Sequence, residues 1–436
     1  MQDAKAKDVS PAEDDDCIWI GVTDKRVIRQ IKEHLDAHGL LNKKKKIDKA
    51  GLLYRLYTVC HNMDRLHGLP VSPHTIGNYS LNKKEPSNSY IDTILAVKTS
   101  QRGHDFNSKI RELIGIVIPN KWVVYRPMVL FSGKYNPNAW QEMKSEGTFE
   151  DFFRRILESS FFGPGITHAA MNHPIHQGDI MRRPVNIEPI IGDFGPEPTP
   201  ALIETPQVHD FEHAFWCCAL QNGIYQVWAP RYCMFSRGNV KEKKRILDFG
   251  RDRGRLYVLD LYAGIGYFTL SYLRNGNIVF CWEINHWSIE GLKRSLSVNN
   301  YKYALVQRTQ SFDIRSMQRC LESGVKAFIF HESNQYAYDR VCAFGNSLPI
   351  SHVNLGLLPS SQASWHVVKR LVSLSISPLT VHVHENLHTD KVPELESAIK
   401  EYYDASVTHI EYVKTFAPDI WHVVFDVLVI PRQDGL

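Results

Sequence analysis

The residues best suited to chemistry lie in the stretch Y-V-L-D-L-Y-A-G-I-G-Y-F-T-L over 257–270. Its first six residues are typical of a strand buried on both faces, with Asp260 as the exception in an apolar run. Gly264 and Gly266 then lack the side chain that would keep a ligand away from the backbone. From Phe268 onward, apolar residues recur at helical spacing. Doubly wound sheets bind nucleotide-like ligands at such a turn, so we expect a ligand site here.

Two further features decide which nucleotide this turn favours. A dinucleotide-binding fingerprint needs a third glycine three residues after the second, but Thr269 occupies that position. The pattern D-x-x-x-G-x-G, followed by a strand with an acidic end, instead resembles the S-adenosylmethionine-dependent transferases. That acidic residue is Glu283, which ends the segment I-V-F-C-W-E and can accept hydrogen bonds from both ribose hydroxyls. A lone G-x-G also occurs in ordinary turns, so the prediction of a donor site depends on Asp260, the glycines and Glu283 together.

Polar side chains before the turn suit the amino-acid end of the same donor. The segment M-F-S-R-G-N over 234–239 predicts a hairpin-like turn, and a short basic helix follows it directly before the strand. This order places Ser236 and Lys243 over the donor pocket, where a hydroxyl and an ammonium can bind the carboxylate of S-adenosylmethionine. A surface turn with a solvated lysine would explain the same residues equally well.

Side chains that end the later strands are candidates for the adenine side of the donor. Ser333 and Asn334 follow a clean apolar strand, and Asn354 lies at the end of the next one. Asp313 is the alternative to Ser333 and Asn334, although it lies in a stretch, 303–326, that is surplus to a simple alternation of strands and helices. We favour Ser333 and Asn334 because their strand is clean.

The histidines provide neither a metal site nor a clear base. His168, His173 and His176 lie within nine residues, but their spacing matches no known ligand pattern. His384 lies near the end of a predicted strand, where a histidine is more often structural. We therefore predict no metal and leave the catalytic residue unassigned.

The elements that must position these residues alternate between strand and helix. After the glycine turn we expect a helix over 287–298, strands over 328–332, 352–358 and 377–386, a helix over 393–403 and strands over 407–416 and 421–430. Only residues 417–420 join the last two strands, so these should be antiparallel neighbours. The predicted fold class is α/β, a Rossmann-like class I S-adenosylmethionine-dependent transferase domain with a reversed edge strand, preceded by smaller α+β domains.

Length and composition divide the rest of the chain. Its 436 residues are enough for two or three domains. We predict a disordered tail over 1–16, an N-terminal α+β domain over 17–119, a middle domain and linker over 120–233 and the catalytic domain over 234–436. Expected elements in the first two domains are strands over 52–59 and 91–98 and helices over 107–114 and 149–158.

Composition also excludes several classes of protein. No apolar stretch approaches the ~20 residues of a membrane span, and the polar N-terminus is unlike a signal peptide. The eight cysteines form no C-x-x-C pair, which indicates free thiols in a reducing compartment and a cytoplasmic protein. A net charge of +4 is too mild to predict nucleic-acid binding by itself.

The motifs together resemble the tRNA wybutosine-synthesizing protein 2 family. The likeness covers roughly residues 120 to 430. Its motifs are M-F-S-R-G-N over 234–239, D-L-Y-A-G-I-G-Y-F-T over 260–269, W-E-I-N over 282–285 and N-L-G-L-L-P-S-S over 354–361, with M-R-R-P over 181–184 and G-D-F-G-P over 192–196 upstream and A-P and W-H-V-V after 416. Related tRNA guanosine-37 N1-methyltransferases typically carry a compact N-[LP]-P where this chain has N-L-G-L-L-P. The family usually has Asp-Asn where this chain has Ser333-Asn334.

The resemblance implies a particular reaction. The 3-amino-3-carboxypropyl group of S-adenosylmethionine would be transferred to C7 of 4-demethylwyosine at position 37 of phenylalanine tRNA. Ser236, Lys243 and Glu283 fall where the family holds its donor. The anticodon loop would be the partner, with the middle domain as its expected contact, and no obligate protein partner is evident. The alternatives are a methyltransferase for guanosine 37 and, from another class, a non-catalytic donor-sensing RNA-binding protein.

Overall fold

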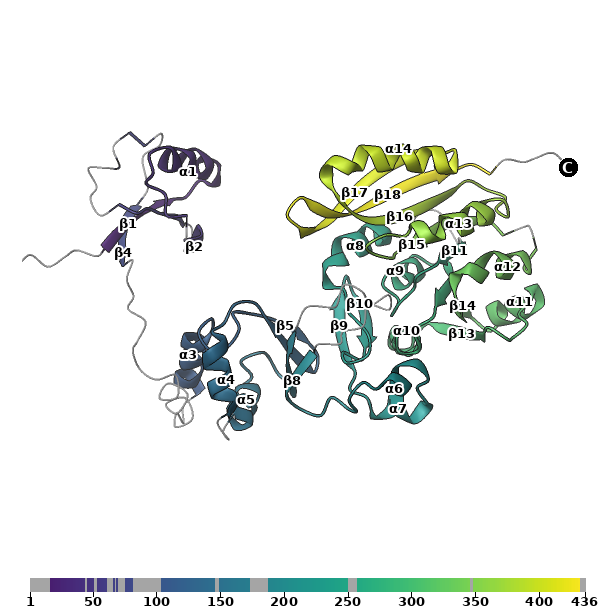
Figure 1. Cartoon of the computed structure of the whole chain (residues 1–436), viewed down its shortest axis with the longest axis horizontal. Coiled ribbons are helices and arrows are strands. Elements are labelled where there is room, and N and C mark those ends of the chain that lie inside the picture. The colour runs from purple at the N-terminus through teal and green to yellow at the C-terminus, as the bar shows by residue number, and fades with distance from the viewer. Residues whose placement is uncertain are drawn as a thin grey trace, which may run out of the picture. The chain divides into compact units, whose positions relative to one another are not determined.

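The computed structural model describes residues 16–43, 45–50, 53–60, 66, 68–69, 75–80, 103–145, 149–172, 187–249, 257–345 and 348–431. Its contacts divide the chain into two compact units, Met1–Ser89 and Tyr90–Leu436, whose elements are drawn in Figure 1. The strand predicted over 91–98 lies outside the described residues, as do His173 and His176.

The first unit is built on a four-stranded antiparallel sheet of order β2-β3-β1-β4. Helix α1 packs against it through Ile31 and Leu35, which lie one turn apart on the same helix face. The strand predicted over 52–59 is confirmed as β3. The elements are β1 (Asp16–Val22), α1 (Ile28–Ala37), β2 (Asp48–Ala50), β3 (Leu53–Tyr57) and β4 (Thr75–Ser80).

The second unit begins with another four-stranded sheet, of order β5-β6-β7-β8. Its elements are α3 (Gly103–Leu113), β5 (Lys121–Tyr125), β6 (Met128–Ser132), α4 (Pro137–Ser145), α5 (Phe149–Glu158), β7 (His168–Asn172) and β8 (Ile187–Ile191). The helix predicted over 149–158 is confirmed as α5. Helix α3 belongs to this unit, because Phe106 and Ile110 pack into the same core as Phe131. The sequence had instead placed this helix in a domain that ends at residue 119.

Two short helices and a hairpin connect this sheet to the rest of the unit. They are α6 (Pro200–Glu204), α7 (Val208–His213), β9 (Cys217–Gln221) and β10 (Ile224–Trp228). The aromatic residues in this passage form a core with the next part of the chain, in which the Tyr232 ring stacks on Trp287 at 3.7 Å between centroids.

The largest sheet has eight strands in the order β13-β14-β12-β11-β15-β16-β18-β17. The strands are β11 (Tyr257–Asp260), β12 (Ile278–Glu283), β13 (Lys302–Gln307), β14 (Val325–His331), β15 (Ile350–Leu355), β16 (Leu379–His388), β17 (Ser406–Ala417) and β18 (Ile420–Val429). Neighbours from β13 to β16 are parallel, and β18 is antiparallel to both β16 and β17. The predicted α/β fold class with a reversed edge is therefore confirmed.

Helices cover both faces of this sheet (Figure 1). One hydrophobic core contains apolar residues of α8, α9 and α10, and a second contains those of α11, α12, α13 and α14. The helices are α8 (Val240–Asp248), α9 (Thr269–Arg274), α10 (His286–Val298), α11 (Ile314–Glu322), α12 (Ala337–Cys342), α13 (Trp365–Val372) and α14 (Val392–Tyr403). The central strands are buried between these layers, which explains their nearly continuous apolar sequence.

The stretch over 303–326, surplus to the predicted alternation, forms a complete additional unit of strand β13 and helix α11. In the described part of the chain strand β13 pairs with β14 alone, so it extends the parallel edge of the sheet by one strand.

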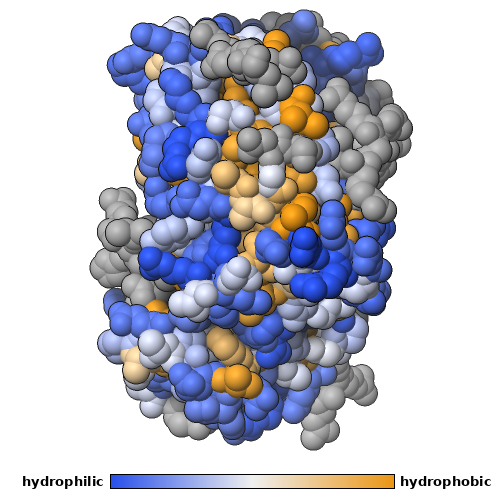
Figure 2. Space-filling view, turned by 90° about the vertical axis from the view of Figure 1, so that its right-hand side faces the viewer, coloured by the Kyte–Doolittle hydropathy of each residue, from blue (hydrophilic) through white to orange (hydrophobic). Residues whose placement is uncertain are grey.

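Figure 2 shows mostly hydrophilic residues on the face seen from the right of Figure 1, with a band of hydrophobic residues along its middle. Among the described residues no helix is long and apolar enough to cross a membrane.

Candidate active site

The glycine turn joins β11 to α9 at the carboxyl end of a central strand. Gly264 and Gly266 have φ of 56° and 89°, in the left-handed region that favours glycine. A Cβ on Gly264 would lie 2.7 Å from the Tyr267 ring, and one on Gly266 would lie 2.8 Å from Leu292 Cδ1. Neither glycine can be replaced by a larger residue without movement of a neighbouring side chain. The shape and packing of this turn therefore require glycine at both positions.

Asp260 lies fully buried beneath the turn and ties three elements together. Its Oδ2 accepts a hydrogen bond from Thr269 Oγ1 at 2.6 Å, and its Oδ1 accepts one from Asn354 Nδ2 at 3.1 Å. Burial raises the pKa of Asp260, while the bonds from Thr269 and Asn354 oppose this rise. These contacts join β11, α9 and β15. Thr269 is the residue that replaces the third glycine of a dinucleotide fingerprint, and its hydroxyl fixes the start of α9.

Glu283, at the end of β12, binds the backbone of the turn next to it. Its Oε2 accepts the Gly264 N–H at 2.8 Å, and its Oε1 accepts the N–H groups of Ile284 and Asn285 at 2.9 and 2.8 Å. Burial raises the pKa of Glu283, and these backbone bonds oppose the rise. A carboxylate has about four lone-pair positions, so one remains for a ligand hydroxyl.

Lys243 lies on α8 and is 3% exposed. Its Nζ donates to Gln226 Oε1 at 2.6 Å and to Gln221 Oε1 at 3.0 Å, and the Gln226 amide donates to the Gly266 carbonyl at 3.0 Å. The same ammonium lies 4.8 Å from the centre of the Phe235 ring. Burial, assisted by the charge of Lys414, lowers the pKa of Lys243 to about 7. Gln226 therefore joins a buried cation to the glycine turn.

Ser236 precedes this helix and lies beside a second lysine. The Nζ of Lys414, on strand β17, donates to Ser236 Oγ at 3.3 Å. A Cβ on Gly238 would lie 2.9 Å from the same Nζ, so the turn after Ser236 packs tightly against this lysine. Two cations and a hydroxyl therefore gather on one side of the glycine turn, which is suitable for a carboxylate.

The two alternatives for the adenine side lie in different surroundings. Asn334 is buried, and its Nδ2 donates to the Leu261 carbonyl at 2.9 Å, directly after β11. Ser333 accepts the Gln335 N–H and caps a short helix. Asp313 is exposed and caps α11 beside the edge of the sheet by accepting the Ser316 N–H at 2.9 Å. Asn334 therefore lies next to the segment that leads into the glycine turn, whereas Asp313 caps a helix near the edge of the sheet.

The loop after β15 is held by the neighbouring strand β16. The backbone N–H and the hydroxyl of Ser361 both donate to Glu385 Oε1, at 2.8 and 3.1 Å. A Cβ on Gly356 would lie 2.9 Å from the Phe268 ring, so this loop packs against the residue directly before α9. The segment that starts at Asn354 thus closes over the same end of the sheet.

Sequence reasoning did not find Gln226, Lys414 or Glu385, which reach the site from distant segments and have no local motif.

His384 Nδ1 lies 3.0 Å from His422 Nε2, and both rings are fully buried. Burial lowers the pKa of His384, and it lowers that of His422 to about 3 with help from Lys414. Within the described ranges no group of three or more metal-ligating side chains is present.

The parallel sheet with its reversed edge, the glycine turn and the acidic end of β12 define an S-adenosylmethionine-dependent transferase domain. Residues 220–323 match the family model described as the TRM5/TYW2 methyltransferase domain. The chain belongs to the tRNA wybutosine-synthesizing protein 2 family.

Two relatives and one solved structure are similar to this chain. The Saccharomyces cerevisiae tRNA wybutosine-synthesizing protein 2 is 33% identical over 474 residues, which cover 94% of this chain and 97% of the relative. The Schizosaccharomyces pombe protein of the same name is 36% identical over 318 residues, which cover 71% of this chain and 72% of the relative. A structure of P. horikoshii TYW2 in complex with MeSAdo is 16% identical, with a TM-score of 0.48, and covers 79% of this chain and all of the other.

Proposed function

We propose that the protein transfers the 3-amino-3-carboxypropyl group of S-adenosylmethionine to C7 of 4-demethylwyosine at position 37 of phenylalanine tRNA. Membership of the wybutosine-synthesizing family supports the pathway and the tRNA substrate. The observation that carries the proposal is the group of Ser236, Lys243 and Lys414 beside the glycine turn. It supplies a hydroxyl and two ammonium groups for the amino-acid end of the donor.

We assign the opposite end of the donor to the acidic side of the turn. Glu283 would accept a hydrogen bond from the ribose, and Asn334 with Ser333 would lie on the adenine side. Asp260 and Asn354 are buried in contact with each other, so we assign them the role of fixing Gly264 and Gly266 in place. The residues at the turn therefore fit a nucleoside with an amino-acid arm.

The choice of transferred group follows from orientation. The sulfonium of S-adenosylmethionine makes three attached carbons electrophilic, so the bound geometry selects the product. By holding the carboxylate end at Ser236 and Lys243 and the ribose at Glu283, the protein fixes which carbon faces the base. C7 forms a bond to the γ-carbon of the arm, the C–S bond breaks to leave methylthioadenosine, and C7 loses its proton.

Donor labelled separately in the methyl and in the carboxyl carbon tests this proposal with hypomodified phenylalanine tRNA. Only the carboxyl label should enter the tRNA. Entry of the methyl label would instead establish a methyltransferase, and entry of neither label would favour a donor-sensing RNA-binding protein. We also propose a cytoplasmic location, which is supported by eight cysteines without a disulfide; cell fractionation measures it directly.

A further inference from the structure

A groove of about 1080 Å³ lies beside the donor site in the second unit. Its walls come from β5, from the hairpin β9–β10 and from the start of α8. The lining residues are Val123, Val124, Tyr125, Arg126, Cys218, Ala219, Leu220, Gln221, Asn222, Tyr225, Arg237, Gly238 and Val240. None of the assigned donor residues lines it, so it is a separate feature that the proposed donor site does not use.

The walls of this groove are fixed by hydrogen bonds between distant segments. The Cys218 N–H donates to the Arg126 carbonyl at 2.8 Å, which joins the end of β5 to β9. The Tyr225 N–H donates to Asn299 Oδ1 at 3.1 Å, and Asn299 Nδ2 donates back to the Tyr225 carbonyl at 2.7 Å. The groove is thus preformed, because its two main walls are joined to each other and to α10.

The charged side chains among the described residues that line the groove are both positive. Arg126 and Arg237 line it, and no aspartate or glutamate does. Arg126 is exposed, with one bond to the Pro164 carbonyl at 3.2 Å. Burial raises the pKa of Tyr125 to about 12, and the nearby charge of Arg237 opposes this rise, which places the second guanidinium beside the same wall.

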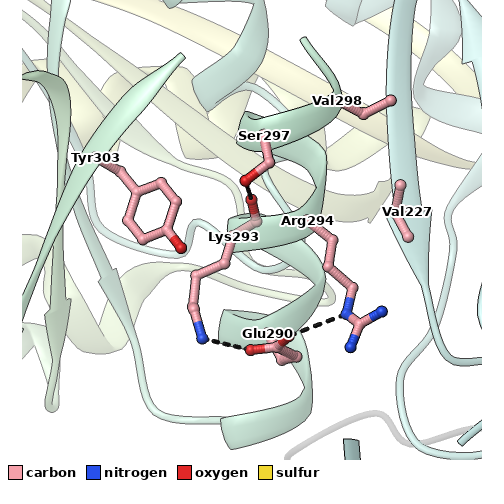
Figure 3. A pocket seen from close by; sticks show the side chains of 7 residues that line it. All are labelled: Val227, Glu290, Lys293, Arg294, Ser297, Val298 and Tyr303. Atoms are coloured by element: carbon pink, nitrogen blue, oxygen red, sulfur yellow. Dashed lines mark hydrogen bonds and ion pairs between the residues drawn. The ribbon is translucent and has the colours of Figure 1, made fainter. Parts of the chain in front are cut away.

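A second cavity, of about 580 Å³ on α10, provides a contrast (Figure 3). It also contains two cations, but Glu290 binds both of them. Lys293 Nζ lies 2.5 Å and Arg294 Nε 2.9 Å from the Glu290 carboxylate. Both cations of that cavity therefore share one carboxylate of the protein, whereas no carboxylate is among the described residues that line the groove.

The rim of the groove adds exposed apolar surface. Tyr225 and Leu220 are cross-strand partners in the hairpin, and they are 42% and 58% exposed. An aromatic ring held on a fixed strand can stack on a nucleic-acid base of any type, since every base has a π-face. Guanidinium groups next to such a ring are the usual contacts for phosphates.

The groove also lies next to the place where the amino-acid arm of the donor would be held. Gln221 lines the groove, and its Oε1 accepts a hydrogen bond from Lys243 Nζ at 3.0 Å. Gly238 lines it as well and packs against Lys414. A chain of nucleotides in the groove would therefore continue towards the reacting end of the donor.

We propose that this groove binds the single-stranded nucleotides that flank the target base in the tRNA loop, with Arg126 and Arg237 at phosphates and Tyr225 stacked on a base. This inference rests on the proposed function, because it takes tRNA as the substrate. Single-stranded loops are the parts of RNA whose bases can be splayed onto aromatic side chains.

The test is the binding of purified hypomodified phenylalanine tRNA to the full chain, measured by fluorescence anisotropy at several salt concentrations. Arg126→Ala and Arg237→Ala should each lower the slope of log affinity against log salt by about one. Tyr225→Ala should weaken binding about tenfold, and this loss should change little with salt. The affinity of S-adenosylhomocysteine, measured by calorimetry, should stay within twofold in Arg126→Ala and Tyr225→Ala.

A matched control removes two exposed arginines from α11. Arg315→Ala with Arg319→Ala changes the net charge by as much as both groove variants together, and neither residue lines the groove. Groove variants whose salt slope and affinity equal those of this control would overturn the inference, as would a wild-type chain that does not bind the tRNA. If the groove variants lose binding while neither label enters the tRNA, the groove stands and the proposed transfer fails.

Discussion

The carboxylate of Glu283 joins the end of β12 to the glycine turn and is our candidate for the ribose. We predict that Glu283→Gln weakens the binding of S-adenosylhomocysteine by roughly 10- to 150-fold, because a hydrogen bond to a charged group contributes about 1.5–3 kcal/mol. Isothermal calorimetry measures this change. Glu396→Gln, which changes a partly buried carboxylate on α14 that pairs with Lys400, is the control. An affinity equal to that of the control would remove Glu283 from the ribose site.

Lys243 provides a prediction about pH. Its pKa is lowered to about 7, so the free protein loses this charge as pH rises above 7. A bound carboxylate favours the charged ammonium, and donor affinity should therefore fall by up to about tenfold for each pH unit above 7. Calorimetry with S-adenosylhomocysteine between pH 6 and 8.5 measures the effect.

Lys243→Met separates this titration from that of the ligand's own amino group. The variant should bind weakly at pH 6 and lose little more affinity at higher pH. Parallel curves for the wild type and the variant would show that Lys243 does not contact the carboxylate.

Among elements, the strand–turn–helix unit at β11 and α9 was the most predictable, because Asp260, Gly264 and Gly266 are local in sequence. The segment 303–326 was not recognised as a strand and a helix, since its short edge strand is only partly buried and carries a weak apolar pattern. Lys414 reaches Ser236 across 178 positions in the chain, and no local spacing predicts such a contact.

Comparison of Gly266 with Gly276 separates the effect of close packing at the glycine turn from the effect of backbone strain, because the two residues have nearly equal φ. Gly266 and Gly276 have φ of 89° and 91°, but only at Gly266 would a Cβ meet another group within 4 Å, namely Leu292 and Leu270. We predict that Gly276→Ala costs about 1–2 kcal/mol in the free energy of unfolding. Gly266→Ala should cost a further ~1–3 kcal/mol from overpacking. Urea unfolding measures both, and equal losses would contradict the close packing of the turn.

For the whole molecule, two buried histidines predict sensitivity to acid. The pKa of His422 is lowered to about 3, against about 6.5 in an unfolded chain, so the unfolded state binds more protons between these values. Stability should therefore fall as pH falls below 6.5, and His422 alone should contribute a loss of about 2 kcal/mol between pH 6.5 and 5. Urea unfolding at these two pH values measures the loss.

His422→Gln should reduce this acid-dependent loss, because the variant side chain does not titrate. His409→Gln changes an exposed histidine on the adjacent strand β17, and this variant should lose as much stability between the two pH values as the wild type. Equal pH dependence in all three chains would show that His422 is protonated without cost.

The fold of the molecule was predictable where the α/β alternation is regular, from β11 to β18 apart from β13 and α11. The first 120 residues were less predictable, because the sheet described there is small and its strands are short. Helix α3 shows the difficulty, since its own sequence does not reveal that Phe106 packs into the same core as Phe131.

The side chain of Gln221 connects two sites that the sequence separates. Gln221 is the last residue of β9 and lines the groove, and its side chain accepts a hydrogen bond from Lys243. Any nucleotide that draws this amide away leaves the lysine with one fewer partner and more affinity for a carboxylate. Binding energies are reciprocal, so the donor must then raise the affinity for tRNA by the same factor. An enzyme built in this way would bind its two substrates cooperatively. The factor by which one substrate raises the affinity for the other would measure how strongly Gln221 couples the two sites.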